Sequence, residues 1–142
     1  MSASPEGTRL VRLWVEKAEN DLRNAAYTLT MEEDCPLDTV CFHAQQCAEK
    51  YIKALLTSMR IEFHRTHDLL ELVWLLPEEI GLRSEVASLS ELNRYAVEAR
   101  YPGDWEPITR EDAEAALATA GRVRDTLRAH LPHEVVPTGA KE

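Results

Sequence analysis

Apolar residues recur every three or four positions along most of this chain, which is the period of an amphipathic α-helix. From position 8 to position 30 one such set faces an arc of charged and amide side chains, and it consists of Leu10, Trp14, Ala18, Leu22, Ala25 and Leu29. After an acidic connection that contains Pro36, a second helix is predicted to reach about Met59, with the carboxylate of Asp38 as its cap. The pattern therefore predicts two long helices in the first 60 positions.

A short third helix is predicted between Thr66, a candidate cap, and Pro77. Its apolar residues, from Leu69 to Leu76, point around most of the circumference. A helix of this kind cannot lie on a surface exposed to water. We expect it to be central or to lie in an interface.

Two more helices are predicted in the last third of the chain. The fourth runs from about Ser84 to Arg100 and stops before Pro102, which cannot continue the hydrogen-bond ladder. The fifth begins after Thr109, with Asp112 three residues on as a weak variant of a capping box. Its apolar face comprises Ala113, Ala116, Leu117, Ala120, Val123, Leu127 and Leu131.

The pattern contains no convincing alternating strand, no glycine-rich phosphate loop and no internal repeat. Short connections favour antiparallel neighbours, so we predict an all-α fold, an antiparallel up-and-down helical bundle of four to five helices. A single domain over residues 8–131 accounts for most of the 142 residues, and we expect flexible termini at 1–7 and 132–142.

The charge and the cysteine content of the chain limit the classes of function and the cellular locations to be expected. Acidic residues outnumber basic ones by 25 to 16, and the formal charge of -9 opposes nonspecific binding to nucleic acids. Cys35, Cys41 and Cys47 form an odd set in a chain that opens without an apolar run, so we expect reduced thiols and a cytoplasmic location. The most apolar stretch, 69–76, is far shorter than the roughly 20 residues that span a bilayer, so we expect no membrane association.

The second helix carries two separate arcs. A close-packing seam is formed by Val40, Ala44, Cys47, Ala48, Tyr51 and Leu55, and a polar stripe by His43, Gln46, Lys50 and Lys53. One interpretation of the stripe is a solvated face, supported by a Glu49 to Lys53 pair at the four-residue spacing. The other is a groove for an anion or a nucleotide phosphate, with the two lysines as point charges beside an imidazole.

A metal site is not predicted. Cys41 and Cys47 are six positions apart, which at 3.6 residues per turn leaves them on different faces of the helix, and His43 points in a third direction. The chain has no CxxC motif. We therefore expect packed cysteines, no metal and no cofactor.

Two further clusters of ionisable and aromatic residues follow. The connection "RIEFHRTHD" at 60–68 is either an anion-binding or acid/base loop, or a surface loop with a helix cap. The stretch "NRYAVEARYPGDW" at 93–105 either cradles a base and a phosphate, or neutralises a helix end and packs the end of the bundle. The side chains concerned are Arg60, His64, Arg65, His67 and Asp68 in the first, and Arg94, Tyr95, Arg100, Tyr101 and Trp105 in the second.

These clusters occur in the order of a known family. The segments "DL" at 21–22, "HAQQCAEKYIKALL" at 43–56, "THDLLEL" at 66–72 and "ARYPGD" at 99–104 together resemble the HEPN domain, the higher eukaryote and prokaryote nucleotide-binding domain. The resemblance covers about residues 10–130. It implies an antiparallel bundle of four or five helices that forms a homodimer. It also implies a minimal nucleotidyltransferase as partner, often in a toxin and antitoxin pair.

One branch of the family consists of metal-independent ribonucleases with an R-x4-6-H motif. At the corresponding position this sequence reads "RYAVEARY", where Arg94 is present but Arg100 stands in place of the histidine. A guanidinium cannot exchange a proton near neutral pH, so the acid/base step is lost there. Arg60 and His67 match R-x6-H by spacing, but before the third helix.

The sequence thus predicts a noncatalytic HEPN module, a homodimer that binds a nucleotide or a partner nucleotidyltransferase, with RNA less favoured. The predicted ligand contacts are Lys50, Lys53, Arg65, His67, Arg94, Arg100 and Tyr101. The alternative is a metal-independent, dimeric RNA endonuclease that uses Arg60 and His67. A third hypothesis is a pure interaction protein whose dimer surface, formed by the third helix and Trp74, is its function.

Overall fold

The computed structural model describes residues 4–96 and 106–137, and these residues form a helical bundle without strands. The helices are α1 (Pro5–Thr28), α2 (Leu37–Ser58), α3 (Leu69–Leu75), α4 (Val86–Asn93) and α5 (Arg110–Arg128). Short 3-10 turns are η1 (Glu78–Ile80), η2 (Leu82–Glu85) and η4 (His133–Val135). The prediction of an all-α bundle is confirmed.

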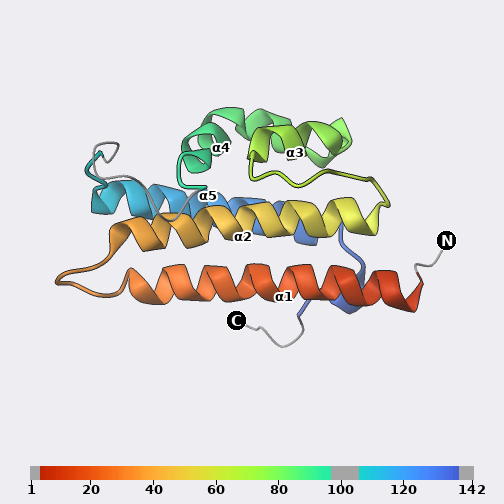
Figure 1. Cartoon of the computed structure of the whole chain (residues 1–142), viewed down its shortest axis with the longest axis horizontal. Coiled ribbons are helices and arrows are strands. Elements are labelled where there is room, and N and C mark those ends of the chain that lie inside the picture. The colour runs from red at the N-terminus through yellow and green to blue at the C-terminus, as the bar shows by residue number, and fades with distance from the viewer. Residues whose placement is uncertain (1–3, 97–105, 138–142) are drawn as a thin grey trace.

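Helix α2 lies at the centre of the bundle, between α1 on one side and α3, α4 and α5 on the other (Figure 1). Helix α1 runs antiparallel to α2, whereas α5 runs in the same direction as α2. The chain makes this possible because the connection after α2, together with α3 and α4, returns it to the end where α2 began. The predicted seam of α2 is confirmed, since all its members, from Val40 to Leu55, are buried.

The buried face of α1 differs from the predicted one. The prediction placed Leu10 in the core, but its side chain is 48 % exposed, and Val11 and Val15 are buried instead. Two carboxylates of the same helix, Glu19 and Asp21, are each only 8 % exposed. Because they bind partners on α2 and α5, the helix is turned about its axis relative to the apolar pattern.

The helix starts confirm one predicted cap and correct two. Thr109 and Asp112 form the predicted capping box, with the Thr109 hydroxyl accepting from Asp112 N and the Asp112 carboxylate from Thr109 N. Asp38 lies inside the first turn of α2, whose N-cap is Pro36. The cap of α3 is not Thr66 but Asp68, whose carboxylate accepts from the amide of the second residue of the helix.

The predicted fourth helix is shorter than expected. A 3-10 turn precedes it, and α4 ends at Asn93, whose side chain accepts a hydrogen bond from Leu69 N instead of facing solvent. Residues 94–96 form a turn and a bend instead of helix, and the last positions of the predicted helix, 97–100, lie outside the described residues, as do Tyr101 and Trp105. Helix α3 is covered by the bundle on one side only, as the 55 % exposure of Trp74 shows.

At both ends of the chain, helical turns extend beyond the predicted domain limits of residues 8 and 131. The domain limits themselves stay a prediction. Helix α1 begins at Pro5, with the Ser4 hydroxyl accepting from Gly7 N, and Val135 of η4 is buried against the core. Within the described residues no helix combines the length and the apolar content that a membrane crossing requires.

Candidate functional site

A group of polar side chains lies along α2 on the face between α1 and the connection 59–68. We call it the α2 cluster; its members are Asp21, His43, Gln45, Gln46, Glu49, Lys50, Lys53 and His67. Two buried carboxylates, Asp21 of α1 and Glu49 of α2, accept most of its hydrogen bonds. The predicted polar stripe is therefore the basic half of a network.

Glu49 is the more deeply buried carboxylate, with 3 % of its side chain exposed. It accepts from Lys53 Nζ at 2.8 Å and from His67 Nδ1 at 3.1 Å. The amides of Gln45 and Gln46 approach the same carboxylate at 3.3 and 3.4 Å. Such a carboxylate is stabilised in its charged form only because every oxygen is bonded.

Lys53 is buried by aromatic rings as well as by its ion pair. Its ammonium lies 5.6 Å from the ring centroid of Trp14 and 5.8 Å from that of Phe63. A cation between two ring faces is attracted by both quadrupoles. Lys53 therefore links α1, α2 and the connection 59–68.

Asp21 is the centre of the other half of the cluster. One of its oxygens accepts from Lys50 Nζ at 2.6 Å and the other is 2.8 Å from His43 Nδ1. With two lysines against two carboxylates, the α2 cluster has no net charge while its histidines are neutral. A phosphate group would thus have to compete with Asp21 and Glu49 for the lysines.

His67 is the most exposed member of the α2 cluster, with 66 % of its side chain accessible. Because Glu49 accepts from Nδ1, the proton of the neutral ring lies there and Nε2 is the acceptor nitrogen. A buried carboxylate thus holds an exposed imidazole in one tautomer. That arrangement suits a polar contact to a ligand, or a proton transfer.

The connection 59–68 runs back along α2 and brings two of the predicted clusters together (Figure 1). The Gln45 side chain donates to His67 O at 3.2 Å, and the Asn93 side chain donates to the Asp68 carboxylate at 3.0 Å. Asn93 also accepts from Leu69 N. Neither Gln45 nor Asn93 was predicted as a linking residue, because the residues that they link to lie more than 20 positions away.

Arg60 is not brought to His67 within one chain. It follows the C-terminus of α2 at Ser58, which lies nine residues or about 14 Å along the helix axis beyond Glu49, whereas His67 lies beside Glu49 itself. Arg65 is exposed on the connection between them.

Arg94 lies apart from the α2 cluster, at the C-terminus of α4. It forms ion pairs with Glu91 at 2.9 Å and Glu106 at 3.1 Å, and its guanidinium lies 5.7 Å from the centroid of the Tyr95 ring. The hydrogen bond to Glu91 raises the pKa of Arg94. Its predicted companions Arg100 and Tyr101 lie outside the described residues.

A shallow pocket of about 150 Å³ lies between α4 and α5, away from the α2 cluster. Its two carboxylates already have partners, since Glu91 binds Arg94 and Asp112 belongs to the capping box of α5. The pocket therefore offers no free charge to a ligand.

A separate buried network joins α1, α2 and α5. Glu19 accepts hydrogen bonds from the Tyr51 hydroxyl and from Arg124 Nε, the latter at 2.6 Å, and Arg128 lies 3.6 Å away. Burial alone raises the pKa of Glu19, but the hydrogen bonds from Arg124 and Tyr51 and the two arginine charges lower it below its usual value. Burial and the bond to Glu19 raise the pKa of Tyr51. This network is enclosed by the core and serves the fold.

The cysteines of α2 are packed in the core, as predicted, and are not candidate nucleophiles. Cys41 and Cys47 are fully buried, and burial raises the pKa of the Cys41 thiol to about 11 and that of Cys47 further. Thiols of this kind are inert because the thiolate is the reactive form. Among residues 4–96 and 106–137, no group of three His, Cys, Asp or Glu side chains is placed to hold a metal ion.

A central helix with a charge-balanced polar cluster, packed among the other helices of the described residues, defines an all-α module. Comparison with known families identifies the module. The HEPN domain matches residues 11–130, and this chain belongs to the HEPN domain family.

The relatives agree with this assignment. The chain is 30 % identical to "Putative toxin MJ1304" of Methanocaldococcus jannaschii, over 92 % of this chain and 94 % of the relative. The crystal structure of ST0689, an archaeal HEPN homologue, superposes with a TM-score of 0.68 at 27 % identity, covering 86 % of this chain and 98 % of ST0689. The crystal structure of TT1696 from Thermus thermophilus gives a TM-score of 0.72 at 30 % identity, covering 85 % and 98 % of the two chains.

Proposed function

We propose that this chain is a noncatalytic HEPN module that acts as a homodimer and binds a minimal nucleotidyltransferase, in a pair of the toxin and antitoxin type. The observation that carries the proposal is the α2 cluster, in which a network of buried side chains holds His67 and Lys50 at the surface in fixed positions. The toxin name of a relative that matches nearly the whole chain supports the pair.

The balance of charges in the α2 cluster supports binding over cleavage. Each lysine has a carboxylate partner within 2.8 Å, so little free positive charge remains to stabilise the extra charge of a phosphoryl transition state. Within one chain, Arg60 also follows the end of α2, whereas His67 contacts Glu49 inside that helix, which argues against their joint action on one phosphate. In this proposal His67, Lys50 and Arg65 make the exposed contacts, and the buried Lys53 positions the residues around it.

A bound nucleotide is the second part of the proposal, with Arg94, Arg100 and Tyr101 as further contacts. Calorimetric titration with ATP and GTP tests it. We expect Lys50→Ala to weaken binding about tenfold, because one charged contact to phosphate is lost, while Arg122→Ala, an exposed change on α5, leaves it unchanged. If millimolar nucleotide releases no heat, the nucleotide part of the proposal is wrong. The binding of a nucleotidyltransferase is then tested by titrating that protein into the chain in the same way.

One observation favours a second candidate, a metal-independent RNA endonuclease. The pairing of His67 with Glu49 orients an imidazole as in acid/base catalysis. Arg60 of one copy would then have to reach His67 of the other. Incubation of labelled RNA with wild type, His67→Ala and His64→Ala as control decides the matter. We expect no cleavage by any of the three proteins. Cleavage that is lost only in His67→Ala would instead favour the endonuclease over the noncatalytic module.

A further inference from the structure

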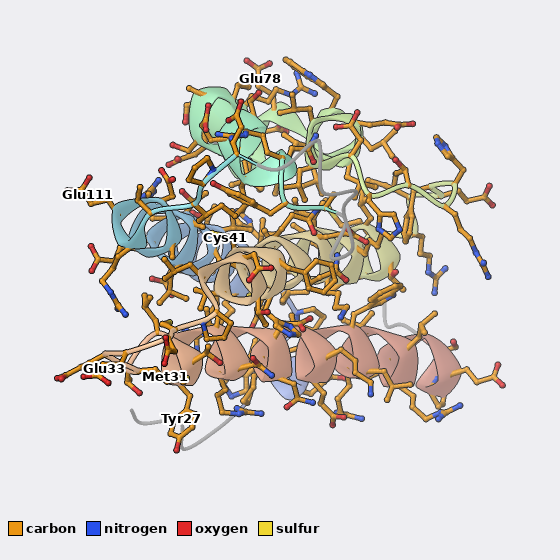
Figure 2. The ribbon with its side chains drawn as sticks, turned by 60° about the vertical axis from the view of Figure 1, so that its left-hand side comes forward. Tyr27, Met31, Glu33, Cys41, Glu78 and Glu111 are labelled. Atoms are coloured by element: carbon orange, nitrogen blue, oxygen red, sulfur yellow. The ribbon has the colours of Figure 1, made fainter. Side chains whose placement is uncertain are left out.

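The surface of this chain as a whole is unfavourable to anions. The formal charge is -9, and acidic side chains such as Glu33, Glu78 and Glu111 point outward from three different parts of the bundle (Figure 2). A field of this sign repels phosphate groups. A nucleotide therefore needs a local source of positive charge on the surface that it contacts.

The lysines of the α2 cluster do not supply that charge by themselves. Lys50 lies 2.6 Å from Asp21, and the buried Lys53 lies 2.8 Å from Glu49. Each ammonium is neutralised by a carboxylate that is itself buried, and separating either pair leaves a buried charge without compensation. Near neutral pH the cluster gains a net positive charge when one of its histidines takes up a proton.

His67 is the histidine best placed to do so, because its ring lies between a buried carboxylate and solvent. Its Nδ1 lies 3.1 and 3.2 Å from the two oxygens of Glu49, and 66 % of its side chain is accessible. The other imidazole of the cluster, His43, is bonded to Asp21 in the same way, but only 22 % of it is accessible. A ligand therefore reaches His67 more readily.

The hydrogen bond to Glu49 decides what the second ring nitrogen of His67 can do. A carboxylate only accepts, so Nδ1 carries a proton in both states of the ring. In the neutral ring Nε2 is an acceptor, and its lone pair opposes the oxygens of a phosphate, which are acceptors too. In the imidazolium Nε2–H donates to a phosphate oxygen while Nδ1–H stays on Glu49. One added proton thus turns a repulsive contact into a charge-assisted hydrogen bond.

Charged side chains from the elements around His67 leave this proton a place on the solvent side of the ring. Apart from Glu49, each of them has a partner of its own or is exposed to solvent. They are Lys53 of α2, Asp21 of α1, Glu71 of α3, and Glu62, Arg65 and Asp68 of the connection 59–68. A proton on Nε2 therefore adds its charge without breaking these pairs.

We propose that a phosphate group bound at the α2 cluster brings with it the uptake of one proton from solvent, on Nε2 of His67. Glu49 is the positioning residue, because it keeps Nδ1 as a donor and the other nitrogen free for the ligand. The imidazolium supplies the positive charge, and Lys50 and Arg65 add contacts beside it. This inference rests on the bound nucleotide of the proposed function and names the protonation state in which it is held.

Calorimetric titration with ATP at about pH 8, in Tris and in HEPES, counts the protons, because the two buffers release a proton with different heats. We expect wild type to take up about one proton more per ATP than His67→Gln, whose amide donates without titrating. Because ATP itself titrates near neutral pH, this difference is the quantity that reports on the side chain. His64→Gln, on the same connection, is the matched control and should take up as many protons as wild type.

The pH dependence of the affinity is the second measurement. Between about pH 6.5 and about pH 8 we expect the Kd of wild type for ATP to rise about tenfold, and that of His67→Gln to change by less than about threefold. Equal proton uptake in wild type and His67→Gln, or uptake that is lost in His43→Gln instead, would overturn this inference and leave the bound nucleotide in place. If ATP binds at neither pH, this inference and the nucleotide part of the proposed function are both wrong.

Discussion

Glu19 is the residue on which the packing of α1 depends most. It is almost fully buried on the inner side of the helix and bonded to Tyr51 and Arg124. Its carboxylate has a folded-state pKa below the usual value of 4.5. The stability that it contributes is therefore complete above about pH 4.5 and is lost as the pH falls through the folded-state pKa.

We predict that Glu19→Gln lowers the free energy of unfolding at pH 7 by about 2–4 kcal/mol, because Arg124 and Arg128 lose their buried counter-charge. The variant should also lose less stability than wild type when the pH is lowered below 4.5. Urea unfolding at pH 7 and at pH 3.5 measures both effects. Glu114→Gln, an exposed change on α5, is the control and should stay within about 0.5 kcal/mol. Equal pH dependence in Glu19→Gln and wild type would contradict this role.

At the residue scale the sequence predicted apolar positions better than charged ones. The α2 seam from Val40 to Leu55 follows the helical period and is buried throughout. Glu19 looks like a surface residue in the same kind of pattern, because its partner Arg124 lies 105 positions away. A pattern read along one helix cannot contain a contact of that range. For the same reason Lys50 could be named but not its pairing with Asp21, whereas the pair of Glu49 and Lys53, four positions apart on one helix, was predicted.

At the scale of helices, local signals were the reliable ones. The capping box of Thr109 and Asp112 is a contact between residues three apart, and it was predicted from the sequence. The end of α4 at Asn93 was not predicted. The Asn93 side chain there accepts a hydrogen bond from Leu69 N, which belongs to another helix.

The start of α5 gives an element-scale prediction. Thr109→Ala removes the hydroxyl that accepts from Asp112 N, and we expect it to lower the free energy of unfolding by about 1 kcal/mol. Thr126→Ala, inside the same helix, is the matched control and should be neutral or slightly stabilising, since alanine has the higher helix propensity. Chemical denaturation measures both. Equal effects of the two substitutions would mean that the cap contributes nothing.

At the scale of the whole molecule, the fold and the family could be predicted from the sequence, and the arrangement of the site could not. Four short segments in order were enough to indicate the HEPN domain, which matches residues 11–130. The convergence of the connection 59–68 on Glu49 depends on the chain turning back along α2, and no periodicity describes that turn. The acidic net charge fits a protein partner better than a nucleic acid.

We propose that this module binds a nucleotidyltransferase as a homodimer. Light scattering coupled to size exclusion tests this on the chain alone and on the chain mixed with a purified minimal nucleotidyltransferase. We predict about 32 kDa for the chain alone, twice its 16.1 kDa, and a single heavier peak for the mixture that contains both proteins. Two separate peaks at the masses of the unmixed proteins, at concentrations up to 100-fold above about 1 μM, would contradict the account.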